Sequence, residues 1–243
     1  MKIAANVLHK FLDLSTVKGA MPELRLNFKE DGLTMQIQSA DNIIMVTGKL
    51  NKKSFVSYEA IGEIGLKNVG ELMQVVGKFQ KEEITVSKET NLLKVLGAST
   101  RGQVELPDLD FIKKFDIIPK LNYEKDGATF KINMSEIREA YDRASIFIKK
   151  KEELEITING HVGKITLLSG KTGKMEKDLK IETVKSDMSA RFGFWLNDLS
   201  LLLDGIVVMK YRTDFPITII YDDEEFKFEY IIAPLVLEED VKK

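Results

Sequence analysis

The sequence predicts an α+β fold in which one helix–strand unit occurs twice. Apolar residues at helical spacing follow Lys2-Ile3 and again follow Lys131-Ile132, and in both places a strongly alternating segment comes next. A second helical pattern and two further strands then close each half. Because several elements recur in the same order about 130 positions apart, we interpret the chain as an internal duplication.

The helices are predicted from apolar residues that share one face. In the first helix of each half these residues are Val7, Leu8, Phe11 and Leu12, then Ile137, Ala140, Tyr141 and Ala144. In the second helix they are Val69, Leu72, Met73 and Val76, then Leu199, Leu202 and Leu203. Ser135 stands where an N-cap is expected at the start of the second half's first helix.

The strands are predicted from alternation of period two. Residues 23–32 and 153–163 alternate, and each run turns through a glycine, Gly32 or Gly160, into a second strand. Two strands close each half, at 82–88 and 91–99, then at 215–221 and 225–233. Between the halves, 106–126 has two prolines and no sustained period, which indicates an extended connector. We therefore expect domains at 1–105 and 127–243.

Composition limits the class of protein. Hydrophobic residues make up 44% of the 243 residues, enough for a packed core, and the formal net charge is −2. The absence of cysteine excludes disulfides and thiolate metal sites, and it fits a reducing, intracellular location. Polar residues interrupt every apolar run near the N-terminus, so neither a signal peptide nor a membrane span is expected.

Catalytic and cofactor motifs are not recognisable in the sequence. The two histidines, His9 and His161, lie in opposite halves, and neither has a second histidine at ligand spacing. The string SGKTGK resembles a phosphate-binding loop, but Ile165 stands where that motif requires glycine. The acidic run at 222–225 is interpreted as a hairpin turn. We predict a protein that is not an enzyme and that binds no metal or cofactor.

Three short motifs connect the chain to a known family. The ending Ile232-Ala233-Pro234 with an acidic tail is similar to the leucine-alanine-proline ending of the DNA sliding clamps, which include the proliferating cell nuclear antigen (PCNA) family and tailed-phage polymerase clamps. Residues 214–217 resemble the Asp-x-Pro strand of cellular clamps, and residues 38–41 resemble the segment that leads into the family's partner pocket. The order of elements matches over essentially the whole chain.

The resemblance implies a DNA-clamp fold that closes as a ring. Three copies would join head to tail through edge strands into a closed ring of six domains, with helices lining the channel and antiparallel sheets outside. The ring would encircle double-stranded DNA without sequence specificity and tether a polymerase as a processivity factor in DNA replication. DNA-facing candidates are the basic residues of the helices and their ends: Lys10, Lys18, Lys78, Lys81, Arg138, Arg143, Lys149, Lys150 and Lys151.

The family also implies a pocket that receives apolar side chains of partner peptides. Its candidates here are Ala40, Ile43, Ile44, Met45, Leu106, Ile117, Ile118, Pro216, Ile231, Ile232, Ala233, Pro234 and Leu235. The expected partners are a DNA polymerase, an ATP-driven clamp loader, other proteins with clamp-binding peptides, and further copies of the chain. A nucleoid-associated or cytoplasmic location follows, in a host cell for a viral protein, or the nucleus for a eukaryotic one.

Two alternatives remain open from the residues themselves. A duplicated scaffold could use the same pocket for protein interactions without ever encircling DNA. An enzyme of unrecognised type would need a residue cluster that the sequence does not display. Oligomeric mass separates the clamp from a monomeric scaffold, and the sequence alone does not decide between a homotrimer and a heterotrimer.

Overall fold

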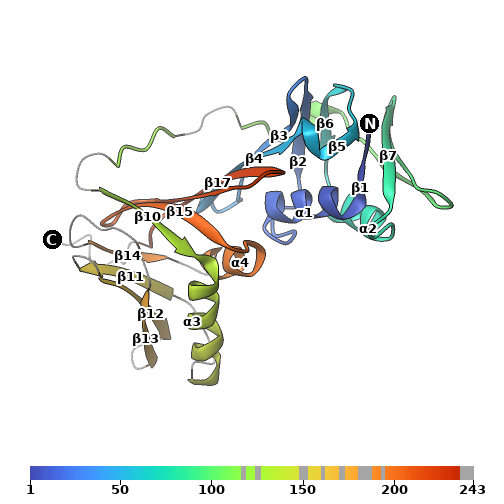
Figure 1. Ribbon diagram of the computed structural model, residues 1–243. Helices are drawn as coiled ribbons and strands as arrows, with labels where there is room; N and C mark the ends of the chain where they lie inside the picture. Colours follow the sequence, from blue (N-terminus) through green and yellow to red (C-terminus); the bar gives the residue numbers. More distant parts are fainter. Residues whose placement is uncertain are drawn as a thin grey trace. The chain divides into compact units, whose positions relative to one another are not determined.

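The computed structural model describes residues 1–115, 119–123, 127–147, 153–159, 162–169, 173–179, 188–192 and 195–235. The chain forms two compact units (Figure 1). Unit 1 contains Met1–Ala40, Met45–Ile118 and Asp222–Phe228, and unit 2 contains Asp41–Ile44, Pro119–Tyr221 and Glu229–Lys243. The junction falls inside the predicted connector, and each unit takes in one short segment that is distant in sequence.

Unit 1 has two antiparallel sheets. The first has the order β5-β1-β7-β8-β9. Its strands are β1 (Lys2–Ala4), β5 (Phe55–Ser57), β7 (Glu83–Glu89), β8 (Leu92–Leu96) and β9 (Arg101–Glu105). The second has the order β4-β3-β2-β6, and the Phe226–Phe228 part of β17 lies beside β4. Its other strands are β2 (Leu24–Lys29), β3 (Gly32–Gln38), β4 (Ile44–Asn51) and β6 (Gly62–Leu66).

Two helices cover the core of unit 1. Helices α1 (Ala5–Thr16) and α2 (Val69–Gly77) pack against each other, as Figure 1 shows. Most residues of the predicted apolar stripes face inward: Leu8, Phe11, Leu12, Val69, Leu72 and Val76 are at most 5% exposed, whereas Val7 and Met73 are half-buried. Two short 3-10 turns, η1 (Lys52–Ser54) and η2 (Leu109–Phe111), complete the unit. The helical spacing in the sequence therefore identified the buried faces correctly.

Unit 2 repeats this arrangement. Its sheets have the orders β13-β12-β11-β14 and β10-β15-β16-β17, with Glu229–Ile232 of β17 in this unit. The strands are β10 (Gly127–Asn133), β11 (Glu153–Asn159), β12 (Val162–Ser169), β13 (Gly173–Leu179), β14 (Met188–Phe192), β15 (Ile206–Arg212), β16 (Ile217–Asp222) and β17 (Phe226–Ile232). Helices α3 (Met134–Phe147) and α4 (Trp195–Leu202) pack together, and α3 also contacts β12 and β13.

The pairing of strands confirms the predicted duplication. In unit 1, β2 pairs antiparallel with β3 and β6, and in unit 2, β11 pairs in the same way with β12 and β14. The pairing of β1 with β7 likewise corresponds to that of β10 with β15. The structure adds strands that the sequence did not predict, namely β1, β4, β5, β6 and β9, and β10, β13, β14 and β15 in the second half. Among them, β5 has no counterpart in the described part of unit 2.

One core position of β4 must be glycine because an aromatic ring fills its side-chain space. A Cβ at Gly48 would overlap the ring of Phe228 and would lie 2.9 Å from the Sδ of Met35. Phe228 is fully buried and also packs on Phe11 of α1, with ring centroids 5.4 Å apart. The absent side chain therefore lets the closing strand bring its ring into the core of unit 1.

We expect Gly48→Ala to lower the free energy of unfolding by about 1–3 kcal/mol, because the added methyl overpacks this core. The measurement is urea denaturation followed by circular dichroism. Gly77→Ala is the matched control, since its Cβ would make only ordinary contact, 3.4 Å from His9 Cδ2. Alanine at Gly77, the last residue of α2, should be neutral or stabilising by up to about 1 kcal/mol. Equal stability of the two variants would contradict the packing argument.

Candidate DNA-facing and partner-binding surfaces

The chain end beyond β17 is hydrogen-bonded on both sides within unit 2. The N–H of Ala233 donates to the carbonyl of Ile43 at 2.8 Å, and the N–H of Leu235 donates to the carbonyl of Arg191 at 2.7 Å. These two bonds fix the backbone of residues 233–235, directly after the strand, to two other segments of unit 2. The side chains of Ala233, Pro234 and Leu235 are half-buried, so each keeps part of its apolar surface in water.

The predicted pocket residues fall into three groups. Unit 2 contains Ile43, Ile44, Pro216, Ile231, Ile232, Ala233, Pro234 and Leu235. Unit 1 contains Ala40, Met45 and Leu106. Ile117 and Ile118 lie outside the described residues.

Burial separates the pocket candidates further. Ile44 and Ile232 are at most 1% exposed, and Ile231 and Leu106 are 8% and 7% exposed. Such side chains belong to the cores of their units, so we leave them out of the surface that a partner could touch. Ile43, Met45 and Pro216 are half-buried and Ala40 is exposed. We use the name C-terminal surface for the unit 2 residues Ile43, Pro216 and Ala233–Leu235.

The end of the connector is anchored beside this surface by Tyr123. Its hydroxyl donates to the carbonyl of Pro216 at 2.8 Å and lies 2.7 Å from the Oγ1 of Thr218. Its ring meets Phe215 edge-on at 5.5 Å, and the guanidinium of Arg212 lies 4.2 Å from the centroid of Phe215. Burial raises the pKa of the Tyr123 hydroxyl, so it stays protonated and able to donate.

The start of the connector is fixed in unit 1 by Arg25 of β2. Its Nε donates to the carbonyl of Ile112 at 2.8 Å, and its Nη2 donates to the carbonyl of Leu109 at 2.5 Å. The ion pair with Glu63, 3.6 Å away, orients the guanidinium. Ile112 is only 2% exposed, whereas its neighbour Phe111 is 75% exposed. Sequence analysis missed Arg25 and Tyr123 because alternation places a residue on a face without showing what it binds.

The basic candidates of unit 1 lie at helix ends. Lys18 follows α1, and Lys78 and Lys81 follow α2, and all three are exposed. Lys10 lies within α1, and its Nζ is 5.2 Å from the centroid of the Phe226 ring. A cation above an aromatic face interacts favourably with its electron density.

Arg138 of α3 caps the neighbouring helix. Its Nε donates to the carbonyl of Ser200 at 2.8 Å, and its Nη2 donates to the carbonyl of Leu203 at 3.2 Å and to Asp204 at 3.0 Å. These carbonyls belong to the last turn and end of α4, where backbone acceptors lack helical partners and the helix dipole favours a cation. The guanidinium predicted to face DNA therefore stabilises the packing of α3 on α4.

Arg143 forms an ion pair with Glu139 one turn before it on α3, and the Arg143 side chain is 62% exposed. Glu139 also accepts a 2.6 Å bond from Lys177 of β13, which contacts Glu136 at 2.9 Å as well. Mainly Lys177, and to a smaller extent Arg143, lowers the pKa of the Glu139 carboxyl.

The remaining basic candidates, Lys149, Lys150 and Lys151, lie outside the described residues.

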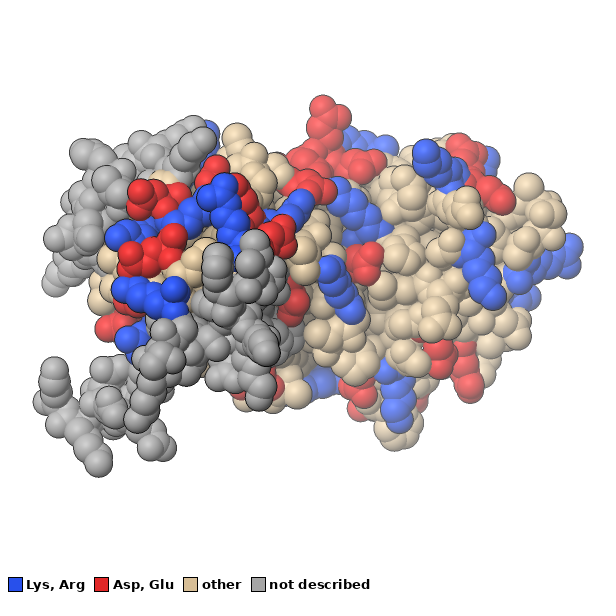
Figure 2. Space-filling view, turned by 90° about the horizontal axis from the view of Figure 1, so that it is seen from below, with Lys and Arg blue, Asp and Glu red and all other residues tan. Residues whose placement is uncertain are grey.

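The helices themselves are not basic. Helix α1 has one lysine and one aspartate, α2 and α4 have one acidic residue each, and α3 has two arginines against three acidic residues. Figure 2 shows Lys and Arg side chains interspersed with Asp and Glu on the face in view. DNA contact by this chain would therefore depend on the cations at helix ends.

The described residues contain no cluster of three or more His, Cys, Asp or Glu side chains that could hold a metal ion. His9 pairs with Asp13 on the same helix at 3.1 Å. In the acidic run, Asp223 accepts bonds from the N–H groups of Glu225 and Phe226, as a turn residue does. No helix among the described residues is long and apolar enough to cross a membrane.

Comparison with known proteins agrees with this architecture. No protein-family profile matches the chain. A DNA polymerase sliding clamp of Natronomonas pharaonis is 22% identical over 247 aligned positions, which cover 96% of this chain and 97% of that protein.

Solved structures extend the comparison to three dimensions. A. fulgidus PCNA, solved with the C-terminal region of FEN-1, is 18% identical with a TM-score of 0.83, covering 98% of both chains. A PCNA2–PCNA3 complex of Sulfolobus tokodaii contains a chain that is 15% identical with a TM-score of 0.78, covering 96% of this chain and 98% of that one. The chain therefore has the fold of the DNA sliding clamps over nearly its whole length. Within that class it is similar to the PCNA proteins, one of the two branches that the resemblance left open.

We expect Arg138→Met to lower the free energy of unfolding by about 1–3 kcal/mol, because three carbonyl or carboxylate oxygens lose a charged donor. Chemical denaturation of the variant measures this change. Arg143→Met is the matched control on the same helix, and its exposed ion pair should leave stability unchanged within error. An Arg138→Met variant as stable as the native chain would show that the capping bonds contribute nothing.

Proposed function

We propose that this protein is a DNA polymerase sliding clamp, a processivity factor that encircles duplex DNA as a closed ring of three copies. The observation that carries the proposal is the clamp fold itself, with its duplicated unit, matched over 98% of both chains at a TM-score of 0.83. The name of the Natronomonas relative supports the link to a polymerase. The protein acts by topology and needs no catalytic group of its own.

The charge distribution supports a role in which linkage to DNA is topological. Phosphate contacts contribute affinity in proportion to the number of cations that neutralise them, and the helices of this chain are close to neutral. Lys18, Lys78 and Lys81 are the exposed cations of unit 1 that we assign to the DNA-facing side. We add Lys10 and Arg143 to this group and leave Arg138 to its capping role. A ring retained by topology slides freely because these contacts are few and weak.

The proposal predicts that retention depends on the shape of the DNA. The protein, placed on a nicked circular duplex by an ATP-driven clamp loader, should stay bound through gel filtration at about 0.5 M salt, where electrostatic contacts are screened. Cutting the circle once should release it. A linear duplex with both ends blocked by bound protein is the control and should retain it.

Equal loss from circular and linear DNA would contradict encirclement. In that case, intact binding of partner peptides would favour the scaffold that never surrounds DNA. Light scattering of the free protein accompanies this test, because a strict monomer at micromolar concentration does not form a ring unaided.

We assign partner docking to the C-terminal surface. Its backbone is fixed by the bonds of Ala233 and Leu235, and half-exposed apolar side chains stand beside the anchored end of the connector. A rigid apolar surface of this kind suits a peptide that inserts hydrophobic anchors, because little ordering entropy is lost on binding. The A. fulgidus relative, solved with the C-terminal region of FEN-1, supports a peptide as the occupant.

We expect Leu235→Ser to weaken binding of a FEN-1 C-terminal peptide by about ten- to a hundredfold, which corresponds to one buried leucine side chain. Fluorescence anisotropy of the labelled peptide measures the affinity. Leu201→Ser, which changes a 44%-exposed leucine of α4, is the matched control and should bind as the native protein does. Unchanged affinity of Leu235→Ser would remove this residue from the docking surface.

A further inference from the structure

Three residues of the β2–β6 pair in unit 1 bind the start of the connector. Arg25 of β2 lies opposite Gly65 of β6 and forms an ion pair with Glu63 at 3.6 Å. Its guanidinium donates to the carbonyls of Leu109 and Ile112. A Cβ at Gly65 would lie only 2.8 Å from the Cγ1 of Ile112. We use the name connector seat for Arg25, Glu63 and Gly65, which together provide a charged donor and the space of a missing side chain.

The connector seat holds the turn η2 in one orientation. Within η2, the N–H of Phe111 donates to the carbonyl of Asp108 at 3.0 Å. The N–H of Ile112 donates to the carbonyl of Leu109, also at 3.0 Å. Ile112 is 2% exposed and Phe111 is 75% exposed. The turn therefore buries Ile112 against Gly65 and leaves Phe111 in water, and Arg25 fixes this choice by binding the backbone on both sides of Phe111.

The second half of the duplication has different residues at the positions of the seat. Strand β11 corresponds to β2, and the alternation of apolar residues in both strands places Glu155 where Arg25 stands. Arg191 lies opposite Glu155, in the place of Gly65. Glu155 accepts a bond of 2.7 Å from the Oγ of Ser189 in its own sheet. A feature that the repeat unit itself required would occur in both halves, so Arg25 and Gly65 are specialised for the connector.

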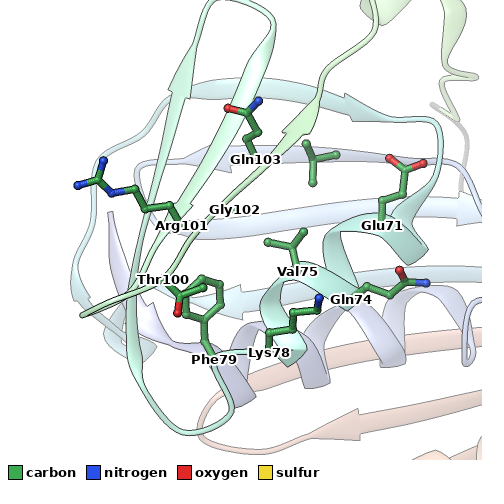
Figure 3. Close-up of a pocket in the computed structure, with 10 residues that line it drawn as sticks. Glu71, Gln74, Val75, Lys78, Phe79, Thr100, Arg101, Gly102 and Gln103 are labelled. Carbon is green, nitrogen blue, oxygen red and sulfur yellow. The ribbon is translucent and has the colours of Figure 1, made fainter.

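A second strand glycine of unit 1 provides a comparison. At Gly102 of β9, a Cβ would overlap the Cγ1 of Val75 on α2, beside a pocket of about 330 Å³ between these two elements (Figure 3). The side chain that takes the place of the missing Cβ there belongs to a helix of the repeated unit. At Gly65 the corresponding side chain is Ile112 of the connector. The space at Gly65 therefore accommodates the connector and not the packing of a helix on its sheet.

The connector also has a fixed end at the C-terminal surface. The hydroxyl of Tyr123 donates to the carbonyl of Pro216, which belongs to that surface. The connector is thus held at its start by Arg25 in unit 1 and at its end by Tyr123 in unit 2. A peptide on the C-terminal surface would lie beside the connector, and a connector with a free start would have to be ordered when the peptide binds. Such ordering costs conformational entropy and lowers the affinity.

We propose that Arg25 is a positioning residue for partner docking: it binds the start of the connector, so that a peptide on the C-terminal surface meets a connector that is already ordered. Arg25 acts through the connector and does not contact the peptide. The inference rests on the proposed function, because it needs the docking assigned to the C-terminal surface. It adds to that assignment a residue of unit 1 that determines the affinity from outside the docking surface.

Binding of η2 to the connector seat and binding of the peptide are then linked. If the seated connector raises the affinity for the peptide by a given factor, the bound peptide favours the seated connector by the same factor. The amides of Phe111 and Ile112 report the seated state, because their hydrogen bonds exist only while the turn η2 is intact. The exchange of these amides with solvent therefore measures the state of the connector independently of the peptide affinity.

Arg25→Met tests the positioning role, because it removes the donor and keeps an unbranched side chain. Binding of a labelled FEN-1 C-terminal peptide, measured by fluorescence anisotropy, should weaken by about three- to tenfold, since residues of the connector must then be ordered on binding. Hydrogen–deuterium exchange of the segment 108–112, read by mass spectrometry, should be faster in the variant than in the native protein. Saturating peptide should slow this exchange in the native protein.

A second variant changes the opposite side of the seat. Gly65→Ala adds a methyl that displaces Ile112 while the guanidinium of Arg25 stays, so it should produce the same two changes. Gly48→Ala is the matched control, because it overpacks the core of unit 1 against Phe228 and does not contact the connector. The control should bind the peptide with native affinity and should show native exchange of the segment 108–112, although it is less stable.

Native peptide affinity in both seat variants, each folded by circular dichroism, overturns the proposal, and faster exchange without a change of affinity does the same by leaving Arg25 a structural anchor only. Equal weakening by Gly48→Ala also overturns it, because the effect then follows from general loss of stability. Failure of the native protein to bind the peptide removes the docking function and this inference with it. Peptide binding that does not depend on Arg25 removes this inference alone.

Discussion

The antiparallel pairing of β17 with β4 is the interaction on which the rest of the structure depends. Residues Phe226–Phe228 come from near the end of the chain, yet they belong to the unit that contains the N-terminus. Phe228 fills the space above Gly48 and packs on Phe11, and Phe226 is buried beside it, with ring centroids 6.4 Å apart. The core of unit 1 is therefore incomplete until the last strand has been made. Long-range pairing of this kind is slow to form, because the chain between its two strands must first be brought together.

Sequence periodicity predicted the duplication, the four helices and the strands whose alternation is regular. It missed β4 and β13 for reasons that specific residues explain. In β4, the inward position 48 is glycine because the ring of Phe228 supplies the missing volume. In β13, the inward position 177 is lysine, whose stem is buried while its ammonium binds Glu136 and Glu139 of α3. Both residues break the apolar alternation, and in each case the compensating group lies far away in sequence.

For the candidate surfaces too, the sequence pattern identified residues but not the contacts that their side chains make. The family resemblance made Arg138 a candidate for DNA contact, but its guanidinium caps α4, a role that depends on how two helices meet. The apolar residues Ala233–Leu235 were predicted to contact partners. The structure adds the backbone hydrogen bonds that fix this segment within unit 2. Tyr123 and Arg25, which fix the two ends of the connector, have no sequence signature because their partners are backbone carbonyls.

The near neutrality of the helices agrees with a clamp that holds DNA by its shape. An open DNA-binding groove would need many ionic bonds to phosphates to stay bound at physiological salt, because screening weakens each of them and lowers the affinity directly. A closed ring needs none of them for retention, since dissociation requires a break in the protein. The free energy that keeps such a protein on DNA resides in the interfaces between copies.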